Sequence, residues 1–419
     1  MDSGDGGSRI QRRHSLCGND PHIYERAMSN RRNCRTTLTL AVLIFACSFA
    51  GSAAEKPRAR DAGIPFEGSP GPLNAITDVA GVKVGHSTII QGEGKLVVGS
   101  GPIRTGVTAV LPRGRDWTDP VFGAWFSLNG NGEMTGTPWL EESGFLEGPV
   151  MITNTHSVGV VRDALVARHV ERTPTGVWWA MPVVAETYDG FLNDVNGLHV
   201  KPKNAFEALD TASPGPVTEG NVGGGTGMIC FGFKGGIGTS SRKLDQKAGG
   251  YTVGVLVQCN CGGRGQLHIA GVPVGQELQK QLTAQVGDFI RQDDTGSIII
   301  VIATDAPLLP HQLKRLARRA TMGLARDGST SGNGSGDLFI AFSTANAAAD
   351  ADTATSQLTM VPNGRMNPLF EATVEATEEA IINAMAAAET MVGRDGHKVE
   401  ALPMDRVREI LKQHARLKQ

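Results

Sequence analysis

The chain has 419 residues, with 40 Lys and Arg against 42 Asp and Glu, so its formal net charge is −2. Because nucleic acids and anionic membranes attract clustered positive charge, this balance argues against both as main partners. Hydrophobic residues make up 40% of the chain and charged residues 20%, which predicts a globular protein with a real core. The 54 glycines follow no three-residue period, so they predict tight turns and not a collagen helix.

The N-terminal segment has the pattern of an export signal. A basic cluster at 31–35 precedes an apolar run at 38–50, and the small residues Gly-Ser-Ala-Ala follow at 51–54. This order predicts a secretory signal peptide within residues 1–54, cleaved after its last residue, with Met28 as the start of translation. The apolar run is too short to span a bilayer comfortably, and a buried helix is the alternative. We therefore expect a periplasmic or secreted protein without stable membrane insertion.

Short runs rich in Val and Ile, bounded by Gly or Asn, predict the first strands. These strands are expected at 79–84, 107–111 and 124–128. Helical spacing of apolar residues follows, and then an apolar run that is typical of a buried strand. The helix is expected at 157–170 and the strand within 177–187, ahead of a loop at 201–227 and two strands at 228–233 and 251–258.

The second half of the chain alternates helices and strands. Expected helices lie at 274–291, 310–324, 371–391 and 403–416, and expected strands at 297–303 and 338–342. Pro310 fits the first position of its helix, because proline has no N–H that would be left unpaired there. Mixed strands and helices, with several helices late in the chain, predict a layered α+β fold. No linker forces a second domain, so residues 55–419 are expected to form a single domain.

Three cysteines follow the predicted signal peptide, namely Cys230, Cys259 and Cys261. An odd number does not predict a disulfide framework. Cys259 and Cys261 lie two apart on a strand-like run, so their Cα atoms are about 7 Å apart, which is too far for an easy bridge. We predict buried thiols here, with a metal site as the alternative.

Several motifs with chemical potential are weak. The glycine cluster at 220–228 lacks the Lys and Ser/Thr of a phosphate-binding loop, so it predicts a backbone bend or a surface that substrate approaches. The histidines do not have metal-ligand spacing, and we interpret His86 and His156 as structural hydrogen-bonding residues. The chain has no Gly-x-Ser-x-Gly element either, which excludes the usual nucleophile of α/β-hydrolases.

The segment STSGNGSGDLFIAFSTAN, at 329–346, places Gly334 and Ser335 between a flexible loop and an apolar strand. Gly334 has no Cβ, so the Ser335 hydroxyl can approach the carbonyl that precedes it. An N→O acyl shift followed by hydrolysis would make Ser335 a new N-terminus. Its α-amine, with a pKa of about 7.7–8, could then act as the base for its own hydroxyl. An ordinary hairpin turn is the alternative.

The motifs taken together resemble the DmpA-type self-processing aminopeptidases, which include L-aminopeptidase/D-esterases and β-aminopeptidases. The resemblance begins at Asn74 and covers nearly all of the mature chain in matching order. It is carried by NAITDVAGVKVGHSTI, NGNGEMTG, ITNTHSVG, AETYDGFLND, GNVGGGTGM, VGVLVQCNCG, NGSGDLFIAFSTAN and NPLFEATVEATEEAIINAM. It implies a layered αββα sandwich like that of N-terminal-nucleophile hydrolases, a homo-oligomer, and no metal or organic cofactor.

The resemblance also implies the site residues. It implies self-cleavage between Gly334 and Ser335, giving an α chain of 55–334 and a β chain of 335–419, with Ser335 as the nucleophile. Tyr188 and Asn260 match the groups that stabilise the developing oxyanion. A hydroxyl residue and a glutamate are expected on the following helix, where Thr373 and Glu375 are the matches and Thr377 and Glu379 the competing register. Glu375 would then hold the substrate's ammonium group.

The predicted function is therefore that of a serine aminopeptidase. It would remove N-terminal residues from short peptides, aminoacyl amides or esters through an acyl-enzyme on Ser335. Two alternatives are a self-cleaving amino-acid acetyltransferase and a non-catalytic periplasmic binding protein. The first normally has a Thr nucleophile, and the second predicts one uncut chain.

Overall fold

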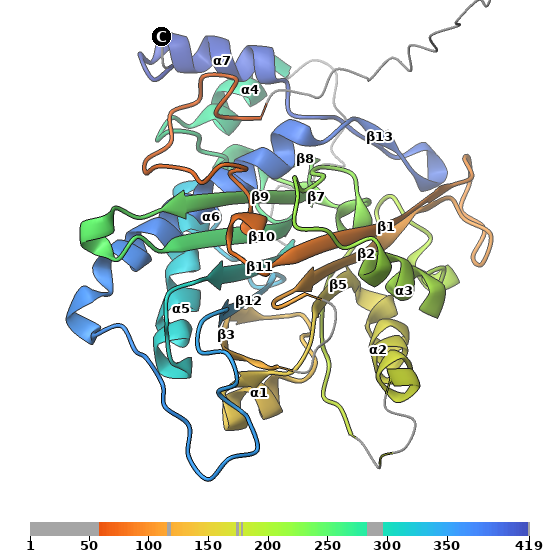
Figure 1. Ribbon diagram of the computed structural model, residues 1–419. Coiled ribbons are helices and arrows are strands. Elements are labelled where there is room, and N and C mark those ends of the chain that lie inside the picture. The colour runs from red at the N-terminus through yellow and green to blue at the C-terminus, as the bar shows by residue number, and fades with distance from the viewer. Residues whose placement is uncertain (1–57, 115–118, 173–175, 177–178, 283–295, 418–419) are drawn as a thin grey trace, which may run out of the picture. The chain divides into compact units, whose positions relative to one another are not determined.

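The computed structural model of the protein describes residues 58–114, 119–172, 176, 179–282 and 296–417. The predicted signal peptide lies outside these residues. Two β-sheets, one of four and one of six strands, stack face to face with helices on their outer sides (Figure 1). Among the described residues, no helix combines the length and the apolar character that a membrane span requires.

The four-stranded sheet has the order β1-β2-β5-β6. Its strands are β1 (Lys83–Gln91), β2 (Ile103–Leu111), β5 (Val150–Asn154) and β6 (Val183–Thr187). β1, β2 and β5 run antiparallel, whereas β5 and β6 run parallel. Helices α2 (Val158–Arg172) and α3 (Pro202–Asp210) cover the outer face through one apolar cluster.

The six-stranded sheet has the order β4-β3-β12-β11-β10-β9. Its strands are β3 (Val121–Gly130), β4 (Phe145–Leu146), β9 (Gly236–Lys243), β10 (Thr252–Asn260), β11 (Ser297–Thr304) and β12 (Gly336–Ser343). β11 and β12 are parallel neighbours, joined by helix α5 (Pro310–Arg326), so both strands begin at the same edge of the sheet. The remaining pairs are antiparallel.

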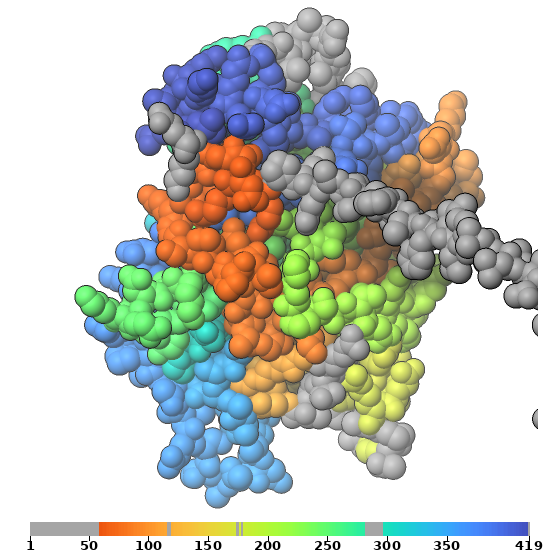
Figure 2. All heavy atoms as spheres, turned by 45° about the horizontal axis from the view of Figure 1, so that its top comes forward, coloured from red at the N-terminus to blue at the C-terminus, as the bar shows by residue number. Residues whose placement is uncertain are grey.

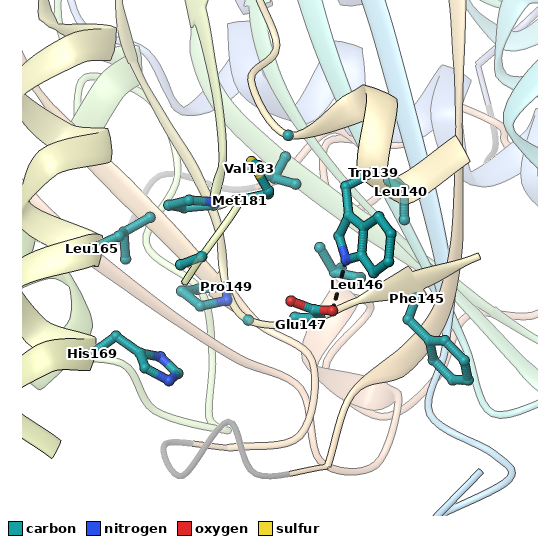
Figure 3. A pocket seen from close by; sticks show the side chains of 14 residues that line it. Trp139, Leu140, Phe145, Leu146, Glu147, Pro149, Leu165, His169, Met181 and Val183 are labelled. Carbon is teal, nitrogen blue, oxygen red and sulfur yellow. Dashed lines mark hydrogen bonds between the residues drawn. The ribbon is translucent and has the colours of Figure 1, made fainter. Parts of the chain in front are cut away.

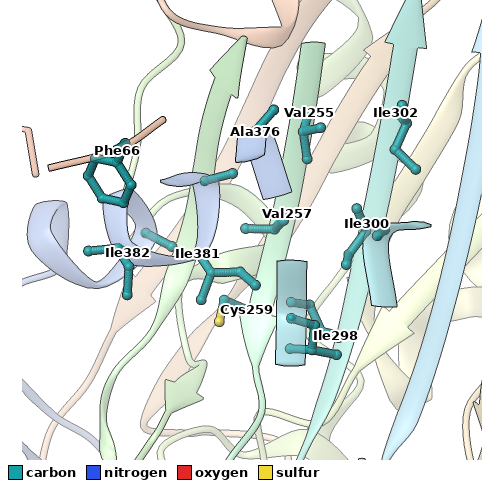
Figure 4. Packing of buried hydrophobic residues seen from close by; sticks show 14 of the residues in the cluster. Phe66, Val255, Val257, Cys259, Ile298, Ile300, Ile302, Ala376, Ile381 and Ile382 are labelled. Carbon is teal, nitrogen blue, oxygen red and sulfur yellow. The ribbon is translucent and has the colours of Figure 1, made fainter. Parts of the chain in front are cut away.

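The β-branched run of β11 shows how one strand serves two layers, because side chains alternate between the faces of a sheet. Ile299 and Val301 point into the core between the sheets, which also contains Ile152 of β5. Ile298, Ile300 and Ile302 point the other way, toward α5 and α6 (Asn367–Ala387), as Figure 4 shows for their packing near Ala376, Ile381 and Ile382. The predicted αββα sandwich is confirmed.

Smaller elements complete the domain. They are α1 (Thr137–Ser143), α4 (Val274–Leu282), α7 (Met404–Gln413), the hairpin of β7 (Ile229–Cys230) with β8 (Phe233–Lys234), and the hairpin of β13 (Met391–Val392) with β14 (Lys398–Val399). The first described segment lies at the surface beside later parts of the chain (Figure 2). There Arg58 pairs with Glu219 at 2.8 Å and Arg60 with Glu379 at 2.6 Å.

Most predicted elements are present, with informative shifts. The expected strand at 79–84 starts only at Lys83, because Ile76–Asp78 form a 3₁₀ turn before it. The expected loop at 201–227 contains α3, which begins with a proline in its first turn. The expected helix at 371–391 starts earlier, at Asn367, also with a proline in its first turn. The end of the expected helix at 274–291 lies outside the described residues.

The glycine cluster at 220–228 forms a tight turn between the two sheets. Its centre, Gly223–Gly225, is a buried 3₁₀ turn. A Cβ on Gly224 would lie 2.1 Å from Gln258 Oε1, and one on Gly225 would lie 2.5 Å from the Ile237 nitrogen. Only glycine allows this approach, so the cluster is explained by packing, in line with the predicted backbone bend.

Candidate active site

One row of residues crosses four strands at an edge of the six-stranded sheet. Asn260, the last residue of β10, pairs with Ser297, the first of β11. Ser297 pairs in turn with Gly336, the first residue of β12, and Gly336 pairs with Gly130 at the end of β3. Neighbouring strands lie about 5 Å apart, so Asn260 and Gly336 flank Ser297 on both sides. Ser335 immediately precedes Gly336.

Ser297 points into the space between the two sheets. It lies two residues before Ile299, whose side chain belongs to the inter-sheet core, and Asn260 shares that face with Leu256. The Gly336 N–H donates a hydrogen bond to Ser297 Oγ at 3.1 Å. The position of Gly296, just before Ser297, has no room for a side chain, because a Cβ there would lie 1.8 Å from the Asn260 carbonyl oxygen.

Ser335 forms a hydroxyl–carboxylate pair with Asp337. Its Oγ donates to Asp337 Oδ1 at 2.7 Å, and both residues are fully buried. The Ser335 N–H donates to the Gly332 carbonyl at 2.8 Å. This pair therefore places a serine hydroxyl, already hydrogen-bonded to a carboxylate, one residue away from the glycine that contacts Ser297.

Two asparagines of the NGNGEMTG motif hold the backbone around Ser335. Asn131 Nδ2 donates to the Gly334 carbonyl at 2.9 Å, and its backbone N–H donates to the Ser335 carbonyl at 3.3 Å. Asn129 Nδ2 donates to the Gly332 carbonyl at 2.6 Å. The predicted cleavage site at Gly334–Ser335 is thus fixed on both sides by hydrogen bonds.

Asn260 and Tyr188, both predicted as site residues, come together here. Asn260 Nδ2 donates to the Tyr188 carbonyl at 3.1 Å, and its Oδ1 accepts from the Ile229 N–H at 2.7 Å. The amide is buried and has a second N–H that can donate to a substrate. The Tyr188 side chain is 41% exposed, and its hydroxyl lies beside Gly190, where a Cβ would be 2.2 Å from it.

Glu186 on β6, a strand of the four-stranded sheet, is a buried carboxylate near the start of β12. Sequence reasoning missed this residue. Its Oε1 accepts from the Glu133 N–H at 3.1 Å, and its Oε2 accepts from the Thr155 hydroxyl. A Cβ on Gly132 would lie 3.2 Å from both Glu186 Oε1 and Gly336 Cα, so the carboxylate stands close to the start of β12. Burial raises the pKa of Glu186, while the hydrogen bond from Thr155 lowers it. Its place two residues before Tyr188 was the available signal.

The structure does not bring Thr373 and Glu375 to the serines. Glu375 pairs with Arg242 at 3.4 Å, and Arg242 lies in the row of paired residues that includes Ser343, at the opposite end of β12 from Gly336. Along β9, Arg242 is about 20 Å from Gly236, which lies at the serine end. Thr373 Oγ1 donates to the Leu369 carbonyl of its own helix at 2.7 Å.

The structure does not bring the competing register, Thr377 and Glu379, to the serines either. Thr377 Oγ1 donates to the Thr373 carbonyl at 2.7 Å, and Glu379 pairs with Arg60 and Arg242. Both hydroxyl groups are therefore satisfied within α6, and both glutamates pair with arginines. The reason is directional: α6 starts beyond the far end of β12, so its first turns lie away from the serines. We place neither pair in the site.

The expectation of buried thiols is wrong for two of the three cysteines. Cys230 and Cys259 form a disulfide, and Cys261 lies beside it, with its Sγ 3.8 Å from Cys259 Sγ. The β7–β8 hairpin brings Cys230 to Cys259 across 29 residues, which strand spacing alone could not reveal. All three sulfurs lie within 4.8 Å, but two of them are bonded to each other and cannot act as thiolate metal ligands.

A pocket away from the serines lies between α1, α2 and the start of β6 (Figure 3). Trp139 and Glu147 line one side, joined by a 2.7 Å hydrogen bond, and His169 lies on the other. Val183 opens β6 at this pocket, whereas Glu186 and Tyr188 lie at the other end of the strand. The pocket is therefore separate from the candidate site.

A layered αββα fold with serines at the edge of the stacked sheets defines a serine hydrolase with a fold of the N-terminal-nucleophile type. The sequence profile of Peptidase family S58 matches residues 74–399, so the chain belongs to that family. The relatives described next are aminopeptidases, and this chain is an aminopeptidase as well. The acetyltransferase and binding-protein alternatives find no support.

Two curated relatives and two solved structures are close. Beta-peptidyl aminopeptidase BapA of Sphingosinicella microcystinivorans is 55% identical over 392 residues, 91% of this chain and 98% of its own length. BapA of Sphingosinicella xenopeptidilytica is 47% identical, covering 89% and 95% of the two chains. The L-aminopeptidase D-Ala-esterase/amidase of Ochrobactrum anthropi, a described variant of the Ntn hydrolase fold, matches with a TM-score of 0.79 and 49% identity over 86% of this chain and all of its own. A Burkholderia sp. beta-aminopeptidase matches with a TM-score of 0.78 and 49% identity over 85% of this chain and 98% of its own.

Proposed function

We propose that the protein is a self-processing aminopeptidase that removes an N-terminal β-amino acid residue from short peptides, amides or esters. The names of the two curated relatives support the β-amino preference. The serine site between the sheets supports the chemistry. Export through the predicted signal peptide to the periplasm or outside the cell, and assembly into a homo-oligomer, are part of the same proposal and rest on the sequence and the resemblance.

The geometry favours Ser297 as the nucleophile, with Ser335 and Asp337 as an acid–base pair beside it. The observation that carries this assignment is that Asn260, the oxyanion candidate, is paired directly with Ser297, whereas Ser335 precedes the first residue of the next strand. Gly296–Ser297 also repeats the feature that singled out Gly334–Ser335, a glycine and a serine at the head of a strongly apolar strand.

Self-cleavage at Gly296–Ser297 needs no external reagent but water. Ser297 Oγ attacks the Gly296 carbonyl carbon, the C–N bond breaks, and the hydroxyl proton passes to the departing nitrogen. Water then hydrolyses the resulting ester, which leaves a glycine carboxylate and a serine with a new α-amine. Because that amine does not exist before the cut, a neighbouring acid–base group must assist, and the Ser335–Asp337 pair stands one residue from Gly336.

In the processed enzyme the Ser297 α-amine takes the proton of its own hydroxyl as Oγ attacks the substrate carbonyl. The second N–H of Asn260 and the Tyr188 hydroxyl donate to the oxyanion, and each such donor contributes about 3–4 kcal/mol at a preorganised site. Glu186 binds the substrate's free ammonium group, the role that the sequence assigned to Glu375. Water releases the acyl group from Ser297 and restores the enzyme.

The competing assignment keeps Ser335 as the nucleophile, with cleavage after Gly334. One observation favours it: Asn131 Nδ2 already holds the Gly334 carbonyl oxygen at 2.9 Å, as an oxyanion donor for that bond would. In this case Asp337 would accept the Ser335 proton before the cut. The two assignments differ in which bond breaks and which fragment carries β11.

Intact mass and N-terminal sequencing of purified protein decide between them. We expect wild type to give a smaller fragment that begins at Ser297, and Ser297→Ala to remain one chain. A fragment that begins at Ser335, lost in Ser335→Ala, would establish the competing assignment. An uncut wild type that still hydrolyses aminoacyl amides would overturn self-processing in either form.

Substrate preference is tested on matched p-nitroanilides. We expect a higher kcat/KM for β-homoalanyl-p-nitroanilide than for L-alanyl-p-nitroanilide, and no hydrolysis of the N-acetylated β-homoalanyl compound. Equal or reversed preference would remove the β-amino part of the proposal and leave the aminopeptidase assignment intact.

A further inference from the structure

The Cys230–Cys259 disulfide joins the two residues that are next in sequence to Ile229 and Asn260, which form a hydrogen bond. Cys259 immediately precedes Asn260 on β10, and Cys230 immediately follows Ile229 on β7. The Ile229 N–H donates to Asn260 Oδ1 at 2.7 Å. The covalent bond therefore connects the two backbone positions next to the hydrogen bond that orients the amide.

This hydrogen bond decides which way the Asn260 amide faces. With Oδ1 held by Ile229, Nδ2 points to the Tyr188 carbonyl and its remaining N–H is available for substrate. Were Ile229 to move away, the amide could turn and present its oxygen, an acceptor that cannot bind an oxyanion. A displacement of only about 1 Å at a positioned catalytic group can lower a rate about 100-fold.

The β7–β8 hairpin is buried and is held by hydrogen bonds as well as by the disulfide, among them one from the Arg264 guanidinium to the Gly232 carbonyl and one from the Lys234 N–H to the Glu400 carbonyl. Each of its strands has two residues, and a two-stranded hairpin is only marginally stable alone. The Phe231 N–H donates to the Cys261 carbonyl at 2.6 Å, and the disulfide, fully buried, is the covalent attachment to β10.

We propose that the Cys230–Cys259 disulfide is a positioning element that keeps the Asn260 amide oriented for catalysis. This inference rests on the proposed role of Asn260. A purely structural disulfide across 29 residues would add a few kcal/mol of stability and would leave the turnover of folded enzyme unchanged.

The first test is chemical. Wild-type protein is unfolded in iodoacetamide without reductant and mapped by peptide mass spectrometry. We expect Cys261 to be alkylated, and Cys230 and Cys259 to be recovered as one cross-linked peptide pair. Alkylation of all three residues would overturn the inference without any need for a variant.

The second test is a double-mutant cycle on purified, processed enzyme. Replacing the disulfide by Cys230→Ala with Cys259→Ala should lower kcat about 10-fold or more with little change in KM, since the amide is misplaced and not removed. Cys261→Ala, a buried neighbour outside the disulfide, is the matched control and should keep wild-type kcat. In an Asn260→Ala background, removing the disulfide should lower kcat no further.

The outcomes distinguish the proposed oxyanion role of Asn260 from the proposed positioning role of the disulfide. A normal kcat in Asn260→Ala would refute the proposed oxyanion role itself. A low kcat in Asn260→Ala with an unchanged kcat in the disulfide variant, or with a further loss in the combined variant, would refute only the positioning role. Should the disulfide variant not fold, the alkylation map still decides whether the cross-link exists, and its absence would refute the positioning role.

Discussion

Glu186 is the buried carboxylate that we propose as the binding partner of the substrate's ammonium group. It is 3% exposed, has no ion pair with an arginine or lysine of the described residues, and lies against the start of β12. Burial without a cationic partner is costly for a carboxylate, which is why its pKa is raised. A substrate ammonium group would supply the missing charge, which is the role that we propose for this residue.

We predict that Glu186→Gln lowers kcat/KM by about 10- to 100-fold, mainly through KM, because a hydrogen bond to a charged group contributes about 1.5–3 kcal/mol. Wild type should also lose activity as the pH falls through the raised pKa, when the carboxylate becomes neutral, and the variant should lack this acid limb. The check is a pH series of kcat and KM on an aminoacyl p-nitroanilide. Glu133→Gln, a neighbour whose backbone rather than side chain contacts Glu186, is the control. An unchanged KM would contradict the assignment.

The sequence could predict the type of residue at this site better than the individual. Glycine–serine ahead of an apolar strand indicated the chemistry, but this pattern occurs at both Ser297 and Ser335. Choosing between them needs the strand register, since only the pairing shows that Asn260 lies opposite Ser297. Local sequence does not contain that information, because β10 and β11 are separated by a long connection.

At the scale of elements, the β7–β8 hairpin depends on a buried lysine. Lys234 Nζ donates to the carbonyls of Met228 and Gly235, each at 2.8 Å, and to that of Gly225 at 3.4 Å. Within the part of the chain that the structure describes, no carboxylate pairs with this amine, and burial lowers the pKa of Lys234 to about 7. The hairpin that contacts Asn260 through Ile229 is thus held by an amine that titrates near neutral pH.

This lysine makes stability depend on pH. Between about pH 7 and 10.5 the unfolded chain binds the lysine proton while the folded chain has lost it, so stability rises with pH, by at most about 1.4 kcal/mol per pH unit. The gain is complete above the unfolded pKa and is lost as the pH falls through 7. We predict that Lys234→Met lacks this slope. Urea midpoints from pH 7 to 10 measure it, with Lys243→Met, an exposed lysine on β9, as the control. Parallel profiles for wild type and Lys234→Met would count against it.

Helix α6 shows the limit of element-level prediction. Its apolar spacing predicted a helix, and the helix exists, but the order of residues along it could not indicate which end lies near the serines. That depends on where the chain leaves β12. Because Ser343 ends β12 far from Ser335, the first turns of α6 are at the far edge, and Thr373 and Glu375 go with them.

Across the whole molecule, ion pairs of the buried Glu379 carboxylate join the first described segment to helix α6. Glu379 accepts from Arg60 and Asn74 and pairs with Arg242 at 2.8 Å. Burial pushes the pKa of Glu379 up, but the hydrogen bond from Arg60 and the charge of Arg242 hold it below its usual value. Arg60 and Glu379 fall on different fragments whether the chain is cut before Ser297 or before Ser335.

We predict that Glu379→Gln destabilises the protein by about 3–5 kcal/mol, because it leaves the buried Arg242 and the part-buried Arg60 without their shared carboxylate. The fragments should then separate at a lower urea concentration in size-exclusion chromatography. Glu378→Gln is the matched control: that residue pairs with the more exposed Arg326 at 2.8 Å, and its loss should cost about 1 kcal/mol or less. Equal effects of the two substitutions would show that burial does not strengthen the ion pairs of Glu379.

The parallel pair β11 and β12 has a last consequence. A strand, a helix and a second parallel strand return the backbone to its point of departure, so the heads of both strands are obliged to be neighbours. A hydroxyl at either head thereby comes under the influence of the same surroundings. This backbone path therefore provides two positions for the nucleophilic hydroxyl, one at the start of β11 and one at the start of β12. Which position carries the nucleophile depends on the side chains there and requires no change in the backbone.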